Sequence, residues 1–416
     1  MPLILLCLLL VLPLHAAEYH VSPSGKDSSK GSRQTPWKTI QRGVSGLSAG
    51  DTLIVHDGTY REHVKLGRSG ERNRPIHIRA NNPQRAQLEG GSFRAFNVSD
   101  IKLEGFLIKN TSDDQPSIDL TGTGSHVEIV NNEITGLQSK NSAALRVRGA
   151  MSNVIIRNNH VHHNNTGNQE AIRVSERTHD FQILDNRVTD NTNIGIDVVG
   201  WAQFGKPYNG LIRGNVTLDN ATGAPWASGI YLDGPDNIIV EYNVSSGNWI
   251  GIQFGCEPSN DSSKNNIARY NLVHGNREYG FSIGGYTGGT VHHCQIHNNV
   301  FANNKRAMGF SRNAGHDNLV VNNILFEPNG QAINFLSKPK DTQIDFNCYT
   351  ARFGEMPGTR SLRVDPMFVD LEKRDFRLRR GSPCIDAGRM VLEGLKDRNG
   401  IPVPRNQKPD IGAFEF

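Results

Sequence analysis

The segment VIIRNNHVHHN at residues 154–164 returns as FQILDNRVTDN at 181–191, GLIRGNVTLDN at 210–220 and IIVEYNVSSGN at 238–248. The sixth residue of each segment belongs to an asparagine ladder with steps of 24 to 29 residues: Asn132, Asn159, Asn186, Asn215, Asn243, Asn271, Asn299 and Asn323. A second ladder follows five positions behind: Asn164, Asn191, Asn220, Asn248, Asn276 and Asn304. A fixed period in the twenties predicts a solenoid, because one repeat cannot bury its apolar side alone.

Each repeat also carries a short alternating segment: Leu145–Arg148, Ile172–Ser175, Ile196–Val199, Ile230–Asp233, Ile252–Gly255 and Phe281–Gly284. The first and third residues are apolar, which is the period of a strand with one buried face. Turn residues separate the segments, and no window has the spacing of a helical repeat. The leucine pattern of leucine-rich repeats is also absent. The sequence therefore predicts an all-β, right-handed parallel β-helix whose asparagines stack along the axis in a structural role.

The composition fits one large exported domain. The chain has 416 residues, 36% hydrophobic content, 43 glycines and a formal charge of +4. This charge is small and no basic run accompanies it, so we expect no nucleic-acid partner. Residues 1–17 hold the apolar run Leu3–Leu14 followed by small residues, which predicts a signal peptide too short to span a bilayer. We expect a monomeric protein without a membrane span, secreted, periplasmic or at the cell surface.

Residues 18–91 are expected to form an N-terminal cap and the first coils. Within them, Pro36–Leu47 places apolar residues on one helical face, with Thr35 as candidate N-cap. A short helix there would cover the open end of the β-helix and block pairing of its edge. The main coils are expected over residues 92–347, and residues 348–416 are expected to cap the other end.

Four cysteines remain after the predicted signal peptide: Cys256, Cys294, Cys348 and Cys384. An exported chain permits disulfides, and four cysteines allow three pairings. Cys348 and Cys384 both lie beyond the ladder, so a bridge between them would tie the tail to the last coils. The alternative is four buried free thiols.

Both ends of the chain resemble segments of secreted β-helix proteins. Residues 19–27, 35–41, 50–55 and 58–62 resemble the N-terminal segment found in family 9 polysaccharide lyases, among other proteins. A second group of residues resembles the domain called choice-of-anchor Q: 365–370, 375–378, 382–388 and 410–416. The resemblance implies a pectate-lyase-like β-helix. It implies less about chemistry, since that superfamily includes lyases, hydrolases, epimerases and inactive binders.

Aligning the alternating strands places their outward residues in two columns. The first column is Asp119, Arg146, Arg173, Asp197, Tyr231, Gln253, Ser282, Gly309 and Asn334. The second is Thr121, Arg148, Ser175, Val199, Asp233, Gly255, Gly284, Ser311 and Leu336, with Glu257 two residues beyond Gly255. Ionisable residues concentrate between the coils of Arg146 and Glu257. They are expected to face outward and to contribute little to the core, lining either a polar groove or a solvated sheet face.

Two insertions border this patch, Trp201–Tyr208 and Ala221–Ser228. Aromatic residues on loops beside a polar groove bind sugar rings by stacking, although such residues also pack against coils. The predicted catalytic residues are Arg173, Asp197, Tyr231, Asp233 and Glu257. The predicted substrate-binding residues are Arg146, Arg148, Trp201, Tyr208 and Trp226. Together they predict a groove for a polysaccharide.

Two catalytic mechanisms fit these residues. A lyase acting on a uronate-containing polysaccharide needs a base, and a cation that neutralises the sugar carboxyl. The arginines could bind that carboxyl, and Asp197 and Asp233 could hold Ca²⁺. Similarity to family 9 lyases implies a calcium site with a lysine base. No lysine stands in the columns, so Arg173 or Tyr231 would have to act as the base.

An inverting glycoside hydrolase instead needs two carboxyl groups ~6.5–9.5 Å apart. Asp197 with Asp233, or Asp233 with Glu257, could supply them. A non-catalytic carbohydrate-binding or surface protein is the third alternative. The arginines favour the lyase on an acidic polysaccharide. Turn histidines do not match a zinc motif, so no metal site is predicted from them: His160, His162, His163, His292 and His293.

Overall fold

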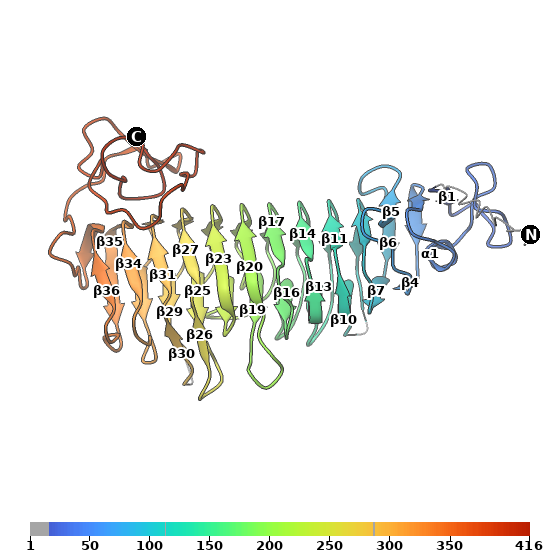
Figure 1. Ribbon diagram of the computed structural model, residues 1–416, viewed down its shortest axis with the longest axis horizontal. Coiled ribbons are helices and arrows are strands. Elements are labelled where there is room, and N and C mark those ends of the chain that lie inside the picture. Colours follow the sequence, from blue (N-terminus) through green and yellow to red (C-terminus); the bar gives the residue numbers. More distant parts are fainter. Residues whose placement is uncertain (1–15, 113, 286–287) are drawn as a thin grey trace, which may run out of the picture.

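The computed structural model describes residues 16–112, 114–285 and 288–416, most of which form a row of stacked coils (Figure 1). Successive coils pair through parallel strands, from β1 (Glu18–Val21) at one end to β37 (Cys348–Phe353) at the other. Among the described residues there is one short helix. The predicted all-β parallel β-helix is confirmed.

Three parallel ladders of strands, named faces A, B and C, surround one core. Face A contains β1, β2 (Thr52–Val55), β5 (Ile76–Ala80), β8 (Ile101–Glu104), β11 (Val127–Val130), β14 (Ile155–Arg157), β17 (Gln182–Leu184), β20 (Tyr208–Arg213), β23 (Asp236–Glu241), β27 (Ile267–Arg269), β31 (Gln295–His297), β34 (Leu319–Val321) and β36 (Gln343–Asp345). Two further strands join its side, β26 (Ser262–Lys264) and β30 (Thr290–His292).

Face B carries the two predicted columns. It contains β4 (His63–Leu66), β7 (Ser92–Phe96), β10 (Ile118–Ser125), β13 (Leu145–Ser152), β16 (Ile172–Ser175), β19 (Ile196–Val199), β22 (Ser228–Asp233), β25 (Ile250–Gly255), β29 (Tyr279–Ile283), β33 (Arg306–Phe310) and the end of β35 (Ile324–Phe335). Face C contains β3 (Gly58–Tyr60), β6 (Ala86–Glu89), β9 (Leu107–Lys109), β12 (Glu133–Thr135), β15 (His160–His162), β18 (Arg187–Thr189), β21 (Val216–Leu218), β24 (Val244–Ser246), β28 (Leu272–His274), β32 (Val300–Ala302), the start of β35, and β37.

Alternation along each strand produces the core. On β5, for example, Ile76 and Ile78 are buried while His77 and Arg79 between them are half-buried. The inward side chains of all three faces form one continuous apolar cluster along the axis. Burying each such Ile, Val or Leu side chain contributes about 1.5–3 kcal/mol. The core therefore grows with every coil added.

The asparagine ladder has the predicted structural role. Asp185, which precedes a ladder position, adopts a left-handed backbone (φ 53°) and turns the chain there. The backbone N–H of Asn186 donates to Oδ1 of Asn215 in the next coil (2.9 Å). The Nδ2 group of Asn215 donates to the carbonyl of Ile183 (2.8 Å). Equivalent bonds recur along the ladder, so buried turn groups of one coil are satisfied by the next coil.

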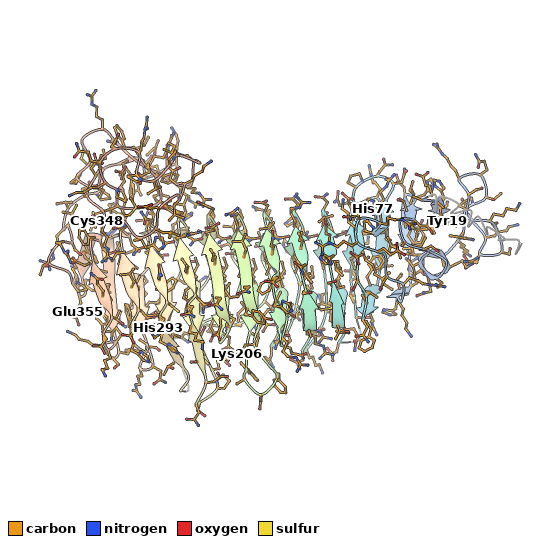
Figure 2. All side chains as sticks on the ribbon, viewed as in Figure 1. Tyr19, His77, Lys206, His293, Cys348 and Glu355 are labelled. Atoms are coloured by element: carbon orange, nitrogen blue, oxygen red, sulfur yellow. The ribbon has the colours of Figure 1, made fainter. Side chains whose placement is uncertain are left out.

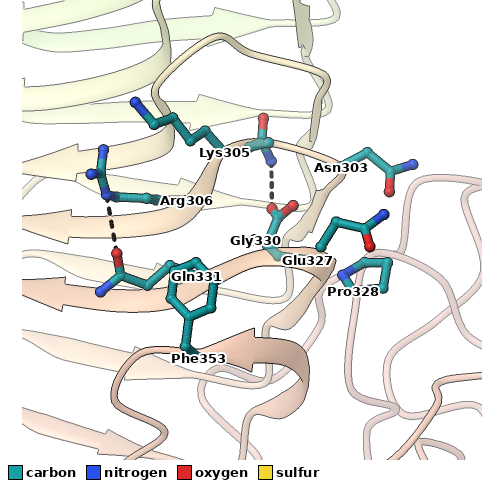
Figure 3. Close-up of a pocket in the computed structure, with 10 residues that line it drawn as sticks. Asn303, Lys305, Arg306, Glu327, Pro328, Gly330, Gln331 and Phe353 are labelled. Carbon is teal, nitrogen blue, oxygen red and sulfur yellow. Dashed lines mark hydrogen bonds between the residues drawn. The ribbon is translucent and has the colours of Figure 1, made fainter.

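Each ladder ends on a residue that the sequence analysis did not assign to it. The N–H of Asn323 donates to Asn347 Oδ1 (2.9 Å), which adds one rung. The second ladder ends where Asn304 Nδ2 donates to Oε1 of Glu327 (2.8 Å). Burial raises the pKa of Glu327 to about 9, so this carboxyl is protonated at neutral pH. Glu327 also lines a surface hollow of about 440 Å³ next to Phe353 (Figure 3).

The N-terminal helix is shorter than predicted. It forms α1 (Ile40–Ser45), and its N-cap is Thr39, whose hydroxyl accepts from the N–H of Arg42 (3.2 Å). The prediction of Thr35 as the cap was wrong. Trp37 is extended because its N–H donates to the carbonyl of His20 (2.9 Å), so the chain cannot turn into a helix earlier. α1 packs beside β1, β2 and β4 at the N-terminal end of the solenoid (Figure 1).

Residues 354–416 fold back along the side of the last coils (Figure 1). They contain the antiparallel pair β38 (Phe368–Asp370) and β39 (Asp375–Leu378) and form a second apolar cluster with Val300 and Ile324. The hydroxyl of Tyr242 donates to the carbonyl of Lys396 (2.7 Å). The tail thus reaches several coils back from the C-terminal end of the solenoid.

All four described cysteines are buried free thiols. Cys348 and Cys384 share the second apolar cluster, and a hydrogen bond with Cys348 together with burial raises the pKa of Cys384. Their pairing as a disulfide stays a prediction. The predicted signal peptide, residues 1–17, lies almost wholly outside the described residues. No helix in the described ranges is long and apolar enough to cross a membrane.

Candidate functional site

The first outward column of face B has the predicted register. Arg173 pairs with Asp197, and Asp197 pairs with Tyr231 on the next coil. The pairing continues in both directions through every predicted member of that column. In the second column Asp233 lies between Val199 and Gly255. The parallel strands therefore bring the five predicted catalytic residues to neighbouring coils.

The central carboxyl groups are buried rather than solvent-facing. Asp197 is 2% exposed, Asp233 3% and Tyr231 5%. The indole Nε1 of Trp201 donates to Oδ2 of Asp233 (2.8 Å), and the N–H of Glu257 donates to Oδ1 (2.8 Å). Loops after β19 and β25 cover these outward positions and form hydrogen bonds with Asp233, so the residues do not face open solvent as expected; their small contribution to folding stays a prediction.

Asp261 and Ser262, on a later coil, hold the loop that carries Trp201. Asp261 accepts from the N–H of Ala202 (2.7 Å) and pairs with the ammonium of Lys206 (2.6 Å). Lys206 also donates to the carbonyl of Ser262. Lys206 lies at the edge of the solenoid from which this loop projects (Figure 2). Two loops from different coils are thereby joined over the buried carboxyl groups.

Glu170 belongs to the same cluster and was missed by the column alignment. It lies two residues before β16, at a corner of the coil, and is 5% exposed. Arg173 Nη1 lies 3.1 Å from both Glu170 oxygens and 2.7 Å from Oε1 of Gln169. An alignment of strand residues could not find it, because its backbone is outside the strand. The available signal was a glutamate three residues before an arginine on the edge of the charged patch.

Burial and mutual repulsion shift the pKa values of this cluster upward. Burial, then the charges of Glu170 and Asp233, raise the pKa of Asp197 well above its ordinary value, against the attraction of Arg173. Burial raises the pKa of Asp233, opposed by its hydrogen bonds from Trp201 and Glu257. The covering of Glu257 by its neighbours, then the charges of Asp233 and Glu170, raise the pKa of that carboxyl.

The charge balance follows from these contacts. Burial also raises the pKa of Glu170, and Arg173, its ion-pair partner, opposes that shift. Glu170, Asp197 and Asp233 thus share the charge of one guanidinium, and Glu257 adds a fourth carboxyl near Asp233 and Glu170, which favours the protonated forms of these groups. Within the described part of the chain, Oδ1 of Asp197 is buried without a hydrogen-bond partner. Such an oxygen in a cluster with raised pKa values is typical of a catalytic site.

The remaining predicted residues lie around this cluster or away from it. Arg146 is held by both oxygens of Asp119 (2.9 Å each), while Arg148 is exposed. Trp226 is 57% exposed, with its ring 5.7 Å from that of Trp249, which the sequence analysis did not single out. Tyr208 begins β20 on face A and stacks on His179 (4.9 Å). The aromatic residues therefore do not gather at one edge.

The predicted calcium ligands Asp197 and Asp233 belong to the carboxyl cluster. Calcium takes six to eight oxygen ligands about 2.3–2.6 Å from the ion. Among the described residues, the one group of three or more metal-ligating side chains within 4.8 Å of one another consists of histidines, described below. Both oxygens of Asp233 already accept N–H groups. The role of Asp197 and Asp233 as calcium ligands stays a prediction.

Two family models match the chain on either side of the Trp201 loop. Residues 19–197 match the model described as Pel9A-like, right handed beta helix region. Residues 204–348 match the model described as right handed beta helix region. These matches support the pectate-lyase-like β-helix superfamily and the right-handed coil. The carboxyl cluster draws residues from both matched ranges.

Comparisons with individual proteins extend over nearly the whole chain. Uncharacterized protein YwoF of Bacillus subtilis (strain 168) is 26% identical over 429 residues, covering 88% of this chain and 91% of YwoF. The crystal structure of pectate lyase Pel9A aligns with a TM-score of 0.57 at 16% identity, covering 96% of each chain. The structure of XylC with xylose aligns with a TM-score of 0.65 at 14% identity, covering 95% and 98%. These structural likenesses show the fold.

Proposed function

We propose that the protein is an exported polysaccharide-active enzyme that cleaves a glycosidic bond by acid–base catalysis on face B. The observation that carries this proposal is the buried group of Glu170, Asp197 and Asp233 around Arg173, with the exposed Glu257 next to Asp233. Carboxyl groups held in both protonated and ionised forms are what glycoside hydrolysis requires. The similarity to Pel9A and to XylC, which was solved with xylose, supports a carbohydrate substrate. The apolar run Leu3–Leu14 supports export.

The environments of two carboxyl groups suggest their roles. Asp233 accepts two N–H groups, which favour its ionised form, and each oxygen keeps a second lone pair. Glu257 is exposed at the surface of the cluster, where a leaving group can reach it, and its pKa is raised. Glu257 would protonate the leaving oxygen, while Asp233 would take a proton from the water that attacks the sugar. Asp197, Glu170 and Arg173 would form the buried floor beneath them.

Uronate elimination is the second candidate, favoured by the Pel9A-like match over residues 19–197. A lyase must neutralise the sugar carboxyl with a cation. Arg173 is already paired with Glu170, and Arg146 with Asp119. The carboxyl cluster would repel an anionic sugar unless a further cation such as Ca²⁺ were bound. The local charge therefore favours hydrolysis of a neutral or weakly acidic chain over elimination.

Product analysis distinguishes the candidates. The purified protein would be incubated with neutral and uronate polysaccharides, with Ca²⁺ or with a chelator, while reducing ends and the ultraviolet absorbance of unsaturated sugars are followed. The proposal predicts reducing ends without unsaturated products and little effect of the chelator. Unsaturated products that require Ca²⁺ would establish the lyase, and binding without cleavage would establish a carbohydrate-binding protein. Asp233→Asn should abolish cleavage, with Glu128→Gln on face A as the control.

A further inference from the structure

Three histidines from two neighbouring coils meet at a turn beside face A. His292 ends β30, His293 follows it with a left-handed backbone (φ 55°), and His316 lies on the next coil. One ring nitrogen from each lies within 4.8 Å of the others. His293 is exposed and the other two are half-buried, so solvent reaches the group. His293 appears on the same edge of the solenoid as Lys206 (Figure 2).

The rings are oriented by contacts with one another and with Asp317. Nδ1 of His292 lies 2.7 Å from Nδ1 of His293. Nδ1 of His316 lies 2.7 Å from Asp317 Oδ2, and Nε2 of His293 lies 3.8 Å from the same oxygen. The rings of His292 and His316 stack at 4.9 Å. A carboxylate on the outer nitrogen of a histidine is the usual means of orienting a metal ligand.

We propose that His292, His293 and His316 bind one divalent transition-metal ion, with Zn²⁺ as the representative ion. The ion would take Nδ1 of His292, Nδ1 of His293 and Nε2 of His316. The protons of the first two rings would then sit on Nε2, where Asp317 faces His293. Nitrogen ligands lie about 2.0–2.1 Å from zinc, so the rings must rotate to separate the two Nδ1 atoms slightly and to bring Nε2 of His316 towards them. The fourth position would remain for water.

The local charges are compatible with such a site. Histidine ligates a metal through a deprotonated ring nitrogen, and solvent reaches these rings, so protons can leave as an ion binds. The ammonium groups of Lys264 and Lys206 act on His292 and would oppose a cation. Lys206 is paired with Asp261, and Asp317 adds a carboxylate beside the ion. Imidazole donors favour Zn²⁺, Cu²⁺ or Ni²⁺ over Ca²⁺ or Mg²⁺.

A second histidine group provides a matched control. Nδ1 of His162 lies 2.8 Å from Nδ1 of His163, which repeats the pair at His292 and His293. This pair lacks a third converging ring, because the nearby His160 stacks on His162 with its Nε2 buried. His162 Nε2 instead contacts Glu133 (3.2 Å). Two adjacent histidines without the ligand from the next coil should bind metal weakly.

The site would join successive coils next to the candidate active site. His293 N–H donates to the carbonyl of His316 (3.3 Å), so the two coils already meet there. His292 pairs in register with Lys264 of β26, the strand whose Ser262 carbonyl accepts from Lys206. A metal ion would therefore strengthen the coil edge that holds the Trp201 loop. Its binding should raise the thermal unfolding temperature even in an inactive enzyme.

Calorimetry on the full chain tests this site. Chelator-treated protein would be titrated with ZnCl₂, and Co²⁺ would report ligand number through its visible absorption. We expect one ion per chain and a higher unfolding temperature. His293→Ala and His316→Ala should weaken binding at least ~10-fold, and Asp317→Asn about 10-fold. The double variant His162→Ala/His163→Ala should bind like the parent.

Three results would overturn the proposal. These are no saturable Zn²⁺ binding by the parent, parental affinity in both His293→Ala and His316→Ala, or loss of binding in the His162→Ala/His163→Ala control. Far-ultraviolet circular dichroism would verify that each variant is folded, and His316→Gln provides a replacement of similar polarity should His316→Ala unfold. Binding that occurs without the rise in unfolding temperature would overturn the proposed link between coils.

Discussion

The asparagine ladder and the carboxyl cluster run through the same coils but treat buried polar groups in opposite ways. In the ladder, the amide of Asn215 accepts from the N–H of Asn186 (2.9 Å) and donates to the carbonyl of Ile183 (2.8 Å), both in the preceding coil. In the cluster, Asp197, Asp233 and Glu170 are equally buried, yet they repel one another and Asp197 Oδ1 has no partner in the described structure. A satisfied polar row stabilises the coil.

This difference in hydrogen bonding indicates a structural role for the asparagine ladder and a functional role for the carboxyl cluster. Nothing in the fold requires acidic residues in the column of face B, since later coils place Ser282 and Gly309 at the same positions. The carboxyl cluster costs stability, because buried like charges must be compensated by protonation or pairing. Residues that reduce stability without a structural need mark a functional site.

The largest effect on stability is expected in the ladder. Asn215→Leu removes bonds to the Asn186 N–H, the Ile183 carbonyl and Asn243, leaving buried groups unsatisfied. We expect a loss of about 3 kcal/mol in the free energy of unfolding, measured by urea denaturation. Asn168→Leu, at an exposed asparagine outside the ladder, is the control and should change stability by less than about 0.5 kcal/mol. An equal loss of unfolding free energy in Asn215→Leu and Asn168→Leu would contradict a special stabilising role of the ladder.

A smaller effect on the free energy of unfolding is expected from the carboxyl cluster, and it depends on pH. The native pKa of Asp197 is raised above its ordinary value of 3.8, so unfolding at higher pH releases a proton. Its contribution to stability is therefore present below the unfolded pKa and falls as pH rises towards the native pKa. One such proton contributes a slope of at most about 1.4 kcal/mol per pH unit. Asp197→Asn should flatten the stability–pH curve above pH 4.

The measurement for this prediction is urea denaturation of the parent and Asp197→Asn proteins between pH 4 and pH 8. Asp341→Asn, which removes an exposed carboxyl on a distant turn, is the control and should follow the parent curve. A steeper fall for Asp197→Asn than for the parent would mean that Asp197 is ionised in the folded protein.

The smallest effect is expected at the rim of the site. The ring of Trp226 is 57% exposed and lies 5.7 Å from that of Trp249. If it stacks on a sugar, Trp226→Ala should raise KM about fivefold at unchanged kcat, since such a contact contributes about 1 kcal/mol. Phe353→Ala, at an exposed ring near the C-terminal end of the solenoid, should leave KM unchanged. A fall in kcat instead would place Trp226 in the catalytic machinery.

The sequence was sufficient for the coil and for the register of face B because both follow from strict periods. The ladder spacing fixed the coils, and alternation placed Arg173, Asp197 and Tyr231 side by side. It was not sufficient for the cover over the site. That cover depends on Trp201 reaching Asp233 across 32 residues, a contact set by loop conformation.

Irregular backbone conformation also explains why the sequence did not predict the place of Glu170, the helix cap or the histidine group. Glu170 lies at a coil corner, where no period governs direction, and Thr39 replaces Thr35 as the cap because contacts with β1 keep Trp37 extended. The meeting of His292, His293 and His316 depends on the length of one coil, which spans 24 residues where the preceding coil spans 28. Periodic parts of this chain are predictable from the sequence, whereas the contacts made between its irregular loops are not.

The most direct measurement of the central claim compares turnover and stability in Glu257→Gln. This carboxyl is exposed at the edge of the cluster, and its charge repels Asp233. On a polysaccharide that the parent cleaves, we predict that kcat falls at least ~100-fold, while the free energy of unfolding stays the same or rises. Glu128→Gln should change neither. Parental turnover in Glu257→Gln, or a loss of turnover matched by a loss of folded protein, would contradict a catalytic carboxyl cluster on face B.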